Sequence, residues 1–145
     1  MKIKNYEYKG TITSKKNSKQ IITNPRTGRP MIISNSRARK NQSDMVAQFM
    51  EQMDADRLRF VLSHEKQEIK AKAKKDGEKY AVFIRITEPD KIHRDLDNQA
   101  TSILDALVEA GALPDDNVQF IVDLRIMLVG FDKDNAGAII EVKEL

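Results

Sequence analysis

The sequence contains no cysteine among its 145 residues. Disulfide bonds, zinc–thiolate sites and cysteine nucleophiles are therefore excluded. The opening segment MKIKNYEYKG lacks the apolar core of a signal peptide, and no apolar run approaches the ~18 residues that a membrane-spanning helix needs. We therefore expect a cytoplasmic protein with one domain over residues 1–145, since a chain of this length buries a core without covalent cross-links.

Charge is unevenly distributed, although the net charge is only +3. Residues 1–43 contain eleven lysines and arginines and a single acid, whereas residues 88–117 contain eight acids and two bases. The basic arm would attract a polyanion, and a bound divalent cation would neutralise the acidic centre. An ordinary solvated surface explains the basic arm equally well.

Hydrophobic periodicity and turn residues predict a single α+β (mixed α/β) domain, with a mixed, mostly antiparallel sheet and two or three helices packed on it in the order β-ββ-α-β-α-β-β. The predicted elements are strands at 3–13, 79–87, 118–130 and 138–145, a hairpin at 20–34, and an amphipathic helix at 97–110 that ends at Gly111. Residues 35–76 lack proline and glycine and predict either one long helix or two with a break near 54–59. Within them, Met45, Phe49 and Met53 form a stripe expected in the core or at a dimer contact. The turn at 131–137 predicts a hairpin between the last two strands.

Four aspartates flank the helix predicted at 97–110. Asp97 is a suitable N-cap, Asp95 adds favourable charge near the helix N-terminus, and Asp115 and Asp116 are common turn residues. As a set they are also candidate magnesium ligands, because Mg²⁺ prefers oxygen donors. The helix is ~20 Å long, so its two ends share one ion only if the helix crosses the sheet at an angle or a second subunit supplies part of the site.

The motifs RDLDN, LDAL and AGALPDDNVQ within residues 94–123 resemble, in residue type and spacing, the RusA family of Holliday-junction resolvases. The segment SKKN and the following Gly-Arg hairpin resemble the opening of that family. The resemblance implies a homodimeric Mg²⁺-dependent endodeoxyribonuclease, with Mn²⁺ as a possible substitute and acidic sites near the subunit interface. Its implied substrate is a four-way DNA junction, resolved by paired symmetric nicks during recombination and repair.

The resemblance also implies roles for individual residues. Asp95, Asp97 and Asp116 would be the catalytic, metal-binding carboxylates, with Asp115 and Asn98 around them. The residues expected to bind DNA are Lys15, Lys16, Asn17, Arg26, Arg29, Arg37, Arg39, Lys40, Lys91 and Arg94. With no aromatic cluster for base stacking, branched shape is the expected basis of recognition.

One position departs from the family pattern. A lysine usually follows the second aspartate of Asp-x-Asp-Asn by four residues, and here that position is Thr101. Such a lysine would stabilise charge at the cleaved phosphate, so Lys15, Lys16, Lys91 or Arg94 would have to replace it. Two alternatives therefore stay open: a DNA-junction-binding module with a degenerate active site, and a nuclease acting on flaps or other branched DNA.

Overall fold

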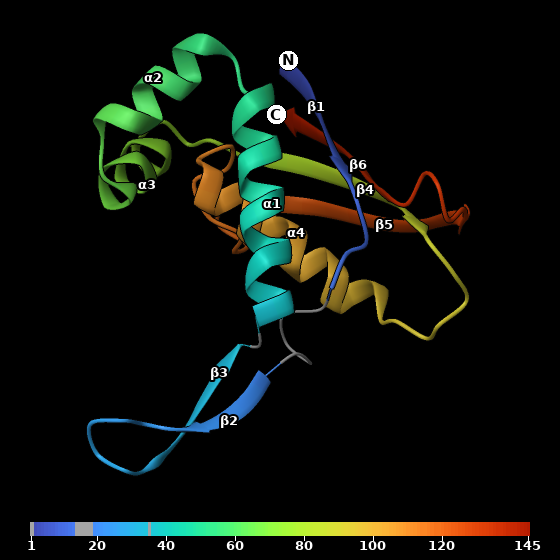
Figure 1. The fold of residues 1–145 in the computed structure, drawn as a ribbon. Helices are drawn as coiled ribbons and strands as arrows, with labels where there is room; N and C mark the ends of the chain where they lie inside the picture. The colour runs from blue at the N-terminus through green and yellow to red at the C-terminus, as the bar shows by residue number, and fades with distance from the viewer. Residues whose placement is uncertain (1, 14–18, 35) are drawn as a thin grey trace.

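The computed structural model describes residues 2–13, 19–34 and 36–145. A four-stranded sheet with the order β1-β6-β4-β5 forms the body, and β2 and β3 form a separate two-stranded sheet (Figure 1). Along the chain the elements are β1 (Lys2–Lys9), β2 (Lys19–Thr23), β3 (Pro30–Ser34), α1 (Ser36–Gln52), α2 (Ala55–Ser63), α3 (Lys66–Lys75), β4 (Tyr80–Glu88), α4 (Leu96–Ala110), β5 (Ile121–Phe131) and β6 (Gly137–Glu144). The predicted α+β class is confirmed.

The sheet mixes one parallel pair with two antiparallel pairs. Strand β4 runs parallel to β5 through the connection that contains α4, and β6 is antiparallel to both β4 and β1. The predicted hairpin between β5 and β6 is wrong, because β6 inserts between β1 and β4. The turn after β5 instead passes the end of β4, where the backbone N–H of Asp132 donates to the carbonyl of Glu88 at 2.8 Å. Strand β5 is consequently an edge strand.

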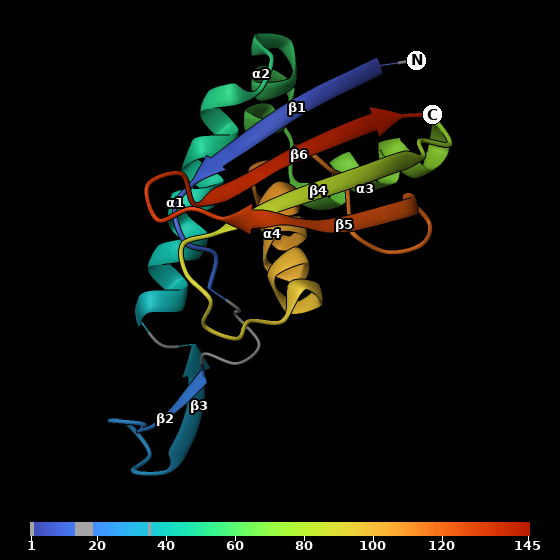
Figure 2. The same ribbon diagram turned by 90° about the vertical axis from the view of Figure 1, so that its right-hand side faces the viewer.

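Helices α1 and α4 cover one face of the sheet, and no helix of the described residues lies on the opposite face (Figure 2). Buried and partly exposed side chains alternate along β4, as expected for a strand with helices on one face only. Val82, Ile84 and Ile86 are buried against the helices. Met45 and Phe49 of α1 are fully buried in the same core. Phe49 meets the ring of Tyr6 edge-on at 5.9 Å between ring centroids. The predicted α1 stripe therefore belongs to the core.

Three helices occupy residues 36–75, not one or two. The first break lies at Asp54 and the second at His64, and both residues have extended backbone angles. At the second break the His64 ring packs on Phe60 with centroids 4.3 Å apart, and its Nδ1 lies 2.8 Å from the carbonyl oxygen of Phe60. None of the helices in the described part of the chain has the length and hydropathy required to span a lipid bilayer.

Helix α4 begins at Leu96, one residue earlier than predicted. Asp95 occupies the N-cap position, so the assignment of Asp97 as N-cap is wrong and Asp97 lies in the first turn. The predicted stop at Gly111 is confirmed: its φ of 90° is left-handed, and the N–H of Ala112 donates to the carbonyl of Leu107 at 2.9 Å. A side chain at position 111 would also collide with Val61 of α2. Glycine at this position therefore both ends the helix and allows α2 to pack closely against it.

Candidate active site

Two exposed carboxylates, Asp95 and Asp97, stand at the start of α4. Asn98 Nδ2 donates to Asp95 Oδ2 at 3.2 Å, and Thr101 Oγ1 donates to the backbone carbonyl of Asp97 at 3.0 Å. Among the described residues, no lysine or arginine forms an ion pair with either carboxylate. The partial positive charge of the helix N-terminus favours negative charge here. This end of α4 therefore presents two accessible oxygen-donor groups.

The loop before α4 is shaped by Arg94, which was predicted to contact DNA. Its Nη1 lies 3.0 Å from the buried Glu88 carboxylate and 2.8 Å from Asp90 Oδ1. The hydrogen bond from Arg94 holds the pKa of Asp90 below its usual value. Only 20% of the Arg94 side chain is exposed, so in this structure Arg94 braces the loop. Lys91, also predicted to bind DNA, lies over the ring of Phe131 with its Nζ 5.9 Å from the centroid.

The second acidic pair follows the C-terminus of α4 and is arranged differently. Asp115 Oδ2 lies 2.6 Å from Lys70 Nζ of α3 and accepts from Asn117 Nδ2 at 3.0 Å, while Asp115 Oδ1 accepts from the backbone N–H of Asp116 at 2.8 Å. The hydrogen bond from Lys70 lowers the pKa of Asp115. Partial desolvation, and then the neighbouring carboxylates of Asp115 and Asp105, raise the pKa of Asp116. Desolvation and the two neighbouring carboxylates therefore both disfavour the ionised form of Asp116.

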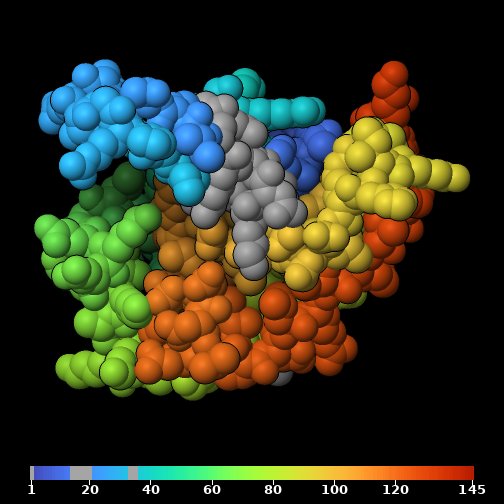
Figure 3. All heavy atoms as spheres, turned by 90° about the horizontal axis from the view of Figure 1, so that it is seen from below, coloured from blue at the N-terminus to red at the C-terminus, as the bar shows by residue number. Residues whose placement is uncertain are grey.

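These two acidic ends do not meet within one chain. Fifteen residues of α4 separate them, about 22 Å at 1.5 Å per residue. Among the described residues, no group of three or more histidines, aspartates or glutamates is placed to hold a metal ion. In the view from below, the segment after α4 (orange) lies beside α2 and α3 (green), and the loop before α4 (yellow) lies on the opposite side (Figure 3).

Buried amides anchor the root of the basic arm beside α4. Gln99 Nε2 of α4 donates to the carbonyl of Ile12 at 3.0 Å, and Asn41 Oδ1 of α1 accepts from the N–H of Thr13 at 3.0 Å. Gln99 and Asn41 are both buried, and burying an amide costs free energy that hydrogen bonds such as these offset. Our sequence reasoning missed both, although an amide inside a stripe of buried helix positions was a detectable signal.

The remaining predicted DNA contacts belong to the arm and the start of α1. Arg26 and Arg29 are exposed in the turn of the β2–β3 hairpin, which projects from the body (Figure 1). A 2.8 Å hydrogen bond between the N–H of Asn24 and the carbonyl of Arg29 closes that turn. Arg37, Arg39 and Lys40 lie in the first turns of α1, and Lys40 pairs with Asp44 at 3.1 Å. Lys15, Lys16 and Asn17 fall outside the described residues.

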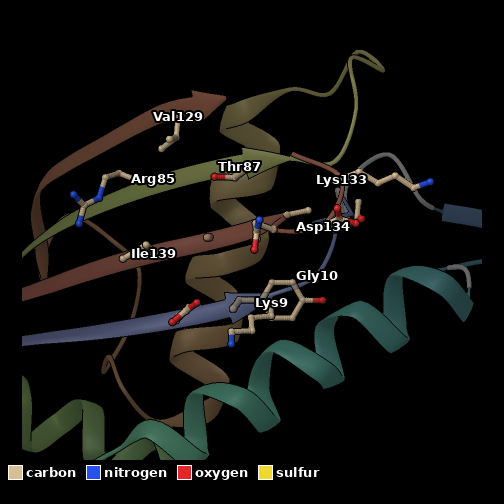
Figure 4. A pocket seen from close by; sticks show the side chains of 15 residues that line it. Lys9, Gly10, Arg85, Thr87, Val129, Lys133, Asp134 and Ile139 are labelled. Atoms are coloured by element: carbon tan, nitrogen blue, oxygen red, sulfur yellow. The ribbon is translucent and has the colours of Figure 1, made fainter. Parts of the chain in front are cut away.

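A cavity of about 730 Å³ lies on the face of the sheet opposite α1 and α4. Lys9, Arg85 and Lys133 line it together with Val129 and Ile139 (Figure 4). None of the four candidate aspartates lines this cavity. Its mixed lining offers no cluster of carboxylates, so we do not assign the candidate chemistry to it.

Comparison with known proteins bears directly on these residues. The family model described as Endodeoxyribonuclease RusA matches residues 12–143, nearly the whole chain. The matched range includes both acidic pairs, the hairpin and all four helices. Among curated proteins, none matches the chain significantly.

Proposed function

The chain belongs to the RusA family of endodeoxyribonucleases, and we propose that it is a Mg²⁺-dependent nuclease that resolves Holliday junctions by paired symmetric nicks during DNA recombination and repair. The observation that carries the proposal is the pairing of carboxylates at both ends of α4 in a chain matched over residues 12–143.

The chemistry of the donor set fits a hard divalent cation. Asp95 and Asp97 at one end and Asp116 at the other offer only oxygen donors. The pKa of Asp116 is raised first by desolvation and then by the neighbouring carboxylates of Asp115 and Asp105, whose negative charge a cation would offset. We assign these three carboxylates as the residues that would hold Mg²⁺, with Mn²⁺ as a substitute. When bound, the ion would polarise the phosphate and lower the pKa of a bound water.

The separation of the two ends supports a site shared between two copies of the chain. In a two-fold dimer with antiparallel α4 helices side by side, Asp95 and Asp97 of one copy would lie near Asp116 of the other. Each site would then be incomplete in a single chain, in agreement with the absence of a three-carboxylate cluster among the described residues.

The free edge of β5 supports the same assembly. Large apolar side chains there are 39–58% exposed: Val122, Leu124, Met127, Leu128, Val129 and Phe131. An edge strand with unpaired backbone groups and exposed apolar side chains is a preferred surface for association. Because α4 lies in the connection between β4 and β5, two copies joined along β5 would bring their α4 helices close together. We therefore assign this edge to the dimer contact.

The protein's own groups would orient the DNA for in-line attack by water on a phosphodiester. Arg26 and Arg29 would bind phosphates and fix the position of the junction without reading sequence. Asn98 would keep Asp95 in place through its 3.2 Å hydrogen bond. Two equivalent sites in one dimer would cut two strands related by the two-fold symmetry of the junction, and so would produce paired nicks.

The test compares labelled four-way junction, flap and linear duplex, each incubated with the protein in Mg²⁺ or EDTA. We expect symmetric nicks in the junction that require Mg²⁺. Preferential cutting of the flap would instead select a nuclease for other branched DNA. One observation favours a second candidate function: Thr101 stands where the family has lysine. Tight junction binding without cutting in any divalent metal would select that candidate, a junction-binding module with a degenerate site.

A further inference from the structure

One lysine contacts the candidate active site directly. Among the described residues, Lys70 is the only cation that forms an ion pair with any of the four candidate aspartates, through the 2.6 Å contact of its Nζ with Asp115 Oδ2. It lies within α3, far from the acidic motifs in the sequence. None of our sequence-based candidates for replacing the family lysine included it.

The geometry fixes Asp115 and leaves donors of Lys70 free. Asp115 uses Oδ1 for the N–H of Asp116 and Oδ2 for both Asn117 and Lys70, so Asp115 is oriented by three donors. An ammonium group has three N–H donors, and the contact with Asp115 uses one of them. The Lys70 side chain is 48% exposed, so the others are accessible to an incoming ligand.

The local charge shows what that ligand would need. Without Lys70, Asp115 and Asp116 of the loop and the nearby Asp105 of α4 would form a group of three neighbouring carboxylates, and three carboxylates repel a phosphate. Lys70 is anchored to Asp115, the residue adjacent to Asp116, so its charge lies at the same loop as the carboxylate assigned to the metal. A cation placed there stabilises the charge that develops on the phosphate during cleavage.

We propose that Lys70, oriented by Asp115, contacts the scissile phosphate and supplies the positive charge that Thr101 lacks. The inference rests on the proposed nuclease function and deepens it. In the shared site, Lys70 comes from the copy that contributes Asp116, and Thr101 comes from the copy that contributes Asp97. The cation would therefore reach the same phosphate from the opposite subunit.

The test measures kcat and KM for junction cleavage in four proteins: wild type, Lys70→Met, Lys70→Arg and Lys72→Met. Lys72 is the matched control, because it also forms a 2.6 Å ion pair, with Asp76, on the same helix. We expect Lys70→Met to lower kcat about 100-fold with little change in KM. Lys70→Arg should retain most activity, and Lys72→Met should behave as wild type.

A rescue experiment separates phosphate contact from a structural role. Adding Thr101→Lys to Lys70→Met should restore cleavage at least ~10-fold, while the thermal midpoints of the variants stay equal. If Lys70→Met cleaved junctions as fast as the wild type, this inference would be overturned and the proposed nuclease function would stand. A loss that neither Thr101→Lys nor Lys70→Arg reverses would also overturn it and assign Lys70 to the fold. A wild-type protein that does not cut junctions would overturn both this inference and the proposed function.

Discussion

The two ends of α4 both carry a pair of aspartates, but their surroundings differ. At the start of the helix, Asp95 and Asp97 are exposed and form no ion pair among the described residues. After its end, Asp115 is bound by Lys70, and the pKa of Asp116 is raised. At the first end the carboxylates are accessible, and the helix dipole favours their negative charge. At the second end several carboxylates lie close together, and Lys70 pairs with one of them. The proposed shared site treats the two ends as complementary half-sites, and the predictions below test each half and their union.

The largest expected effect comes from removing a carboxylate at either end. Asp97→Asn and Asp116→Asn should each lower Mg²⁺-dependent junction cleavage by about 10²–10³-fold, because each removes a negative oxygen ligand from the same shared site. Cleavage of labelled junctions measures the effect, with Asp134→Asn in the turn before β6 as a matched control. Full activity in either variant would show that the aspartate at that end of α4 does not belong to the active site.

The second-largest effect on cleavage should come from separating the two copies of the dimer. Leu128→Lys places a charge on the β5 edge, where the native side chain is 39% exposed, and should weaken the dimer about 30-fold or more. Sedimentation at several concentrations measures this, and cleavage should fall with the dimer fraction. Ile3→Lys on the other edge strand, β1, is the control. If Leu128→Lys left the dimer intact and Ile3→Lys dissociated it, the contact would be assigned to the wrong edge.

Substitutions in the β2–β3 hairpin should weaken DNA binding and leave both half-sites unchanged. Replacing Arg26 and Arg29 with alanine should weaken junction binding several-fold and reduce the slope of log affinity against log salt by about 1–2. Titrations at several salt concentrations in Ca²⁺ measure both quantities. An unchanged salt slope would exclude phosphate contacts by this turn.

The smallest expected effect is on thermal stability, which should change in opposite directions for substitutions at the two ends of α4. The raised pKa of Asp116 means that its ionised form costs folding free energy above that pKa, and that this cost is absent below the ordinary value for aspartate. At pH 7 without metal, Asp116→Asn should therefore raise the melting temperature by about 1–2 °C. Asp97→Asn should lower it by about 1–2 °C, because a favourable charge is lost from the first turn of α4. Melting curves that shift in the same direction for both variants would contradict the difference between the ends.

Local patterns predicted the parts of the fold that depend on nearby residues. The strand at 79–87 and the stop at Gly111 were predicted because each depends on the residues or backbone angles of a single element. The position of β6 between β1 and β4 was not, because strand pairing depends on residues far apart in the chain. The break at His64 lacks proline or glycine, so no local signal marked it.

The candidate site divides in the same way. The four aspartates were visible as motifs around one helix, whereas the Lys70–Asp115 pair joins α3 to a loop after α4 and depends on tertiary packing. Arg94 shows the reverse case: its motif position predicted a DNA contact, and the fold pairs it with Glu88 and Asp90. Motif spacing thus predicted the acidic groups, whereas only the fold reveals the pairing of Lys70 with Asp115.

Mixed dimers test most directly the claim that each site combines the two ends of α4 from different copies. Asp97→Asn and Asp116→Asn proteins, each inactive alone, are mixed in equal amounts, unfolded and refolded together. A shared site leaves one intact site in every mixed dimer, so about a quarter of wild-type nicking should return, as single nicks. Sites contained within one chain would leave every mixed dimer without an intact site, and no recovery of nicking would contradict the account.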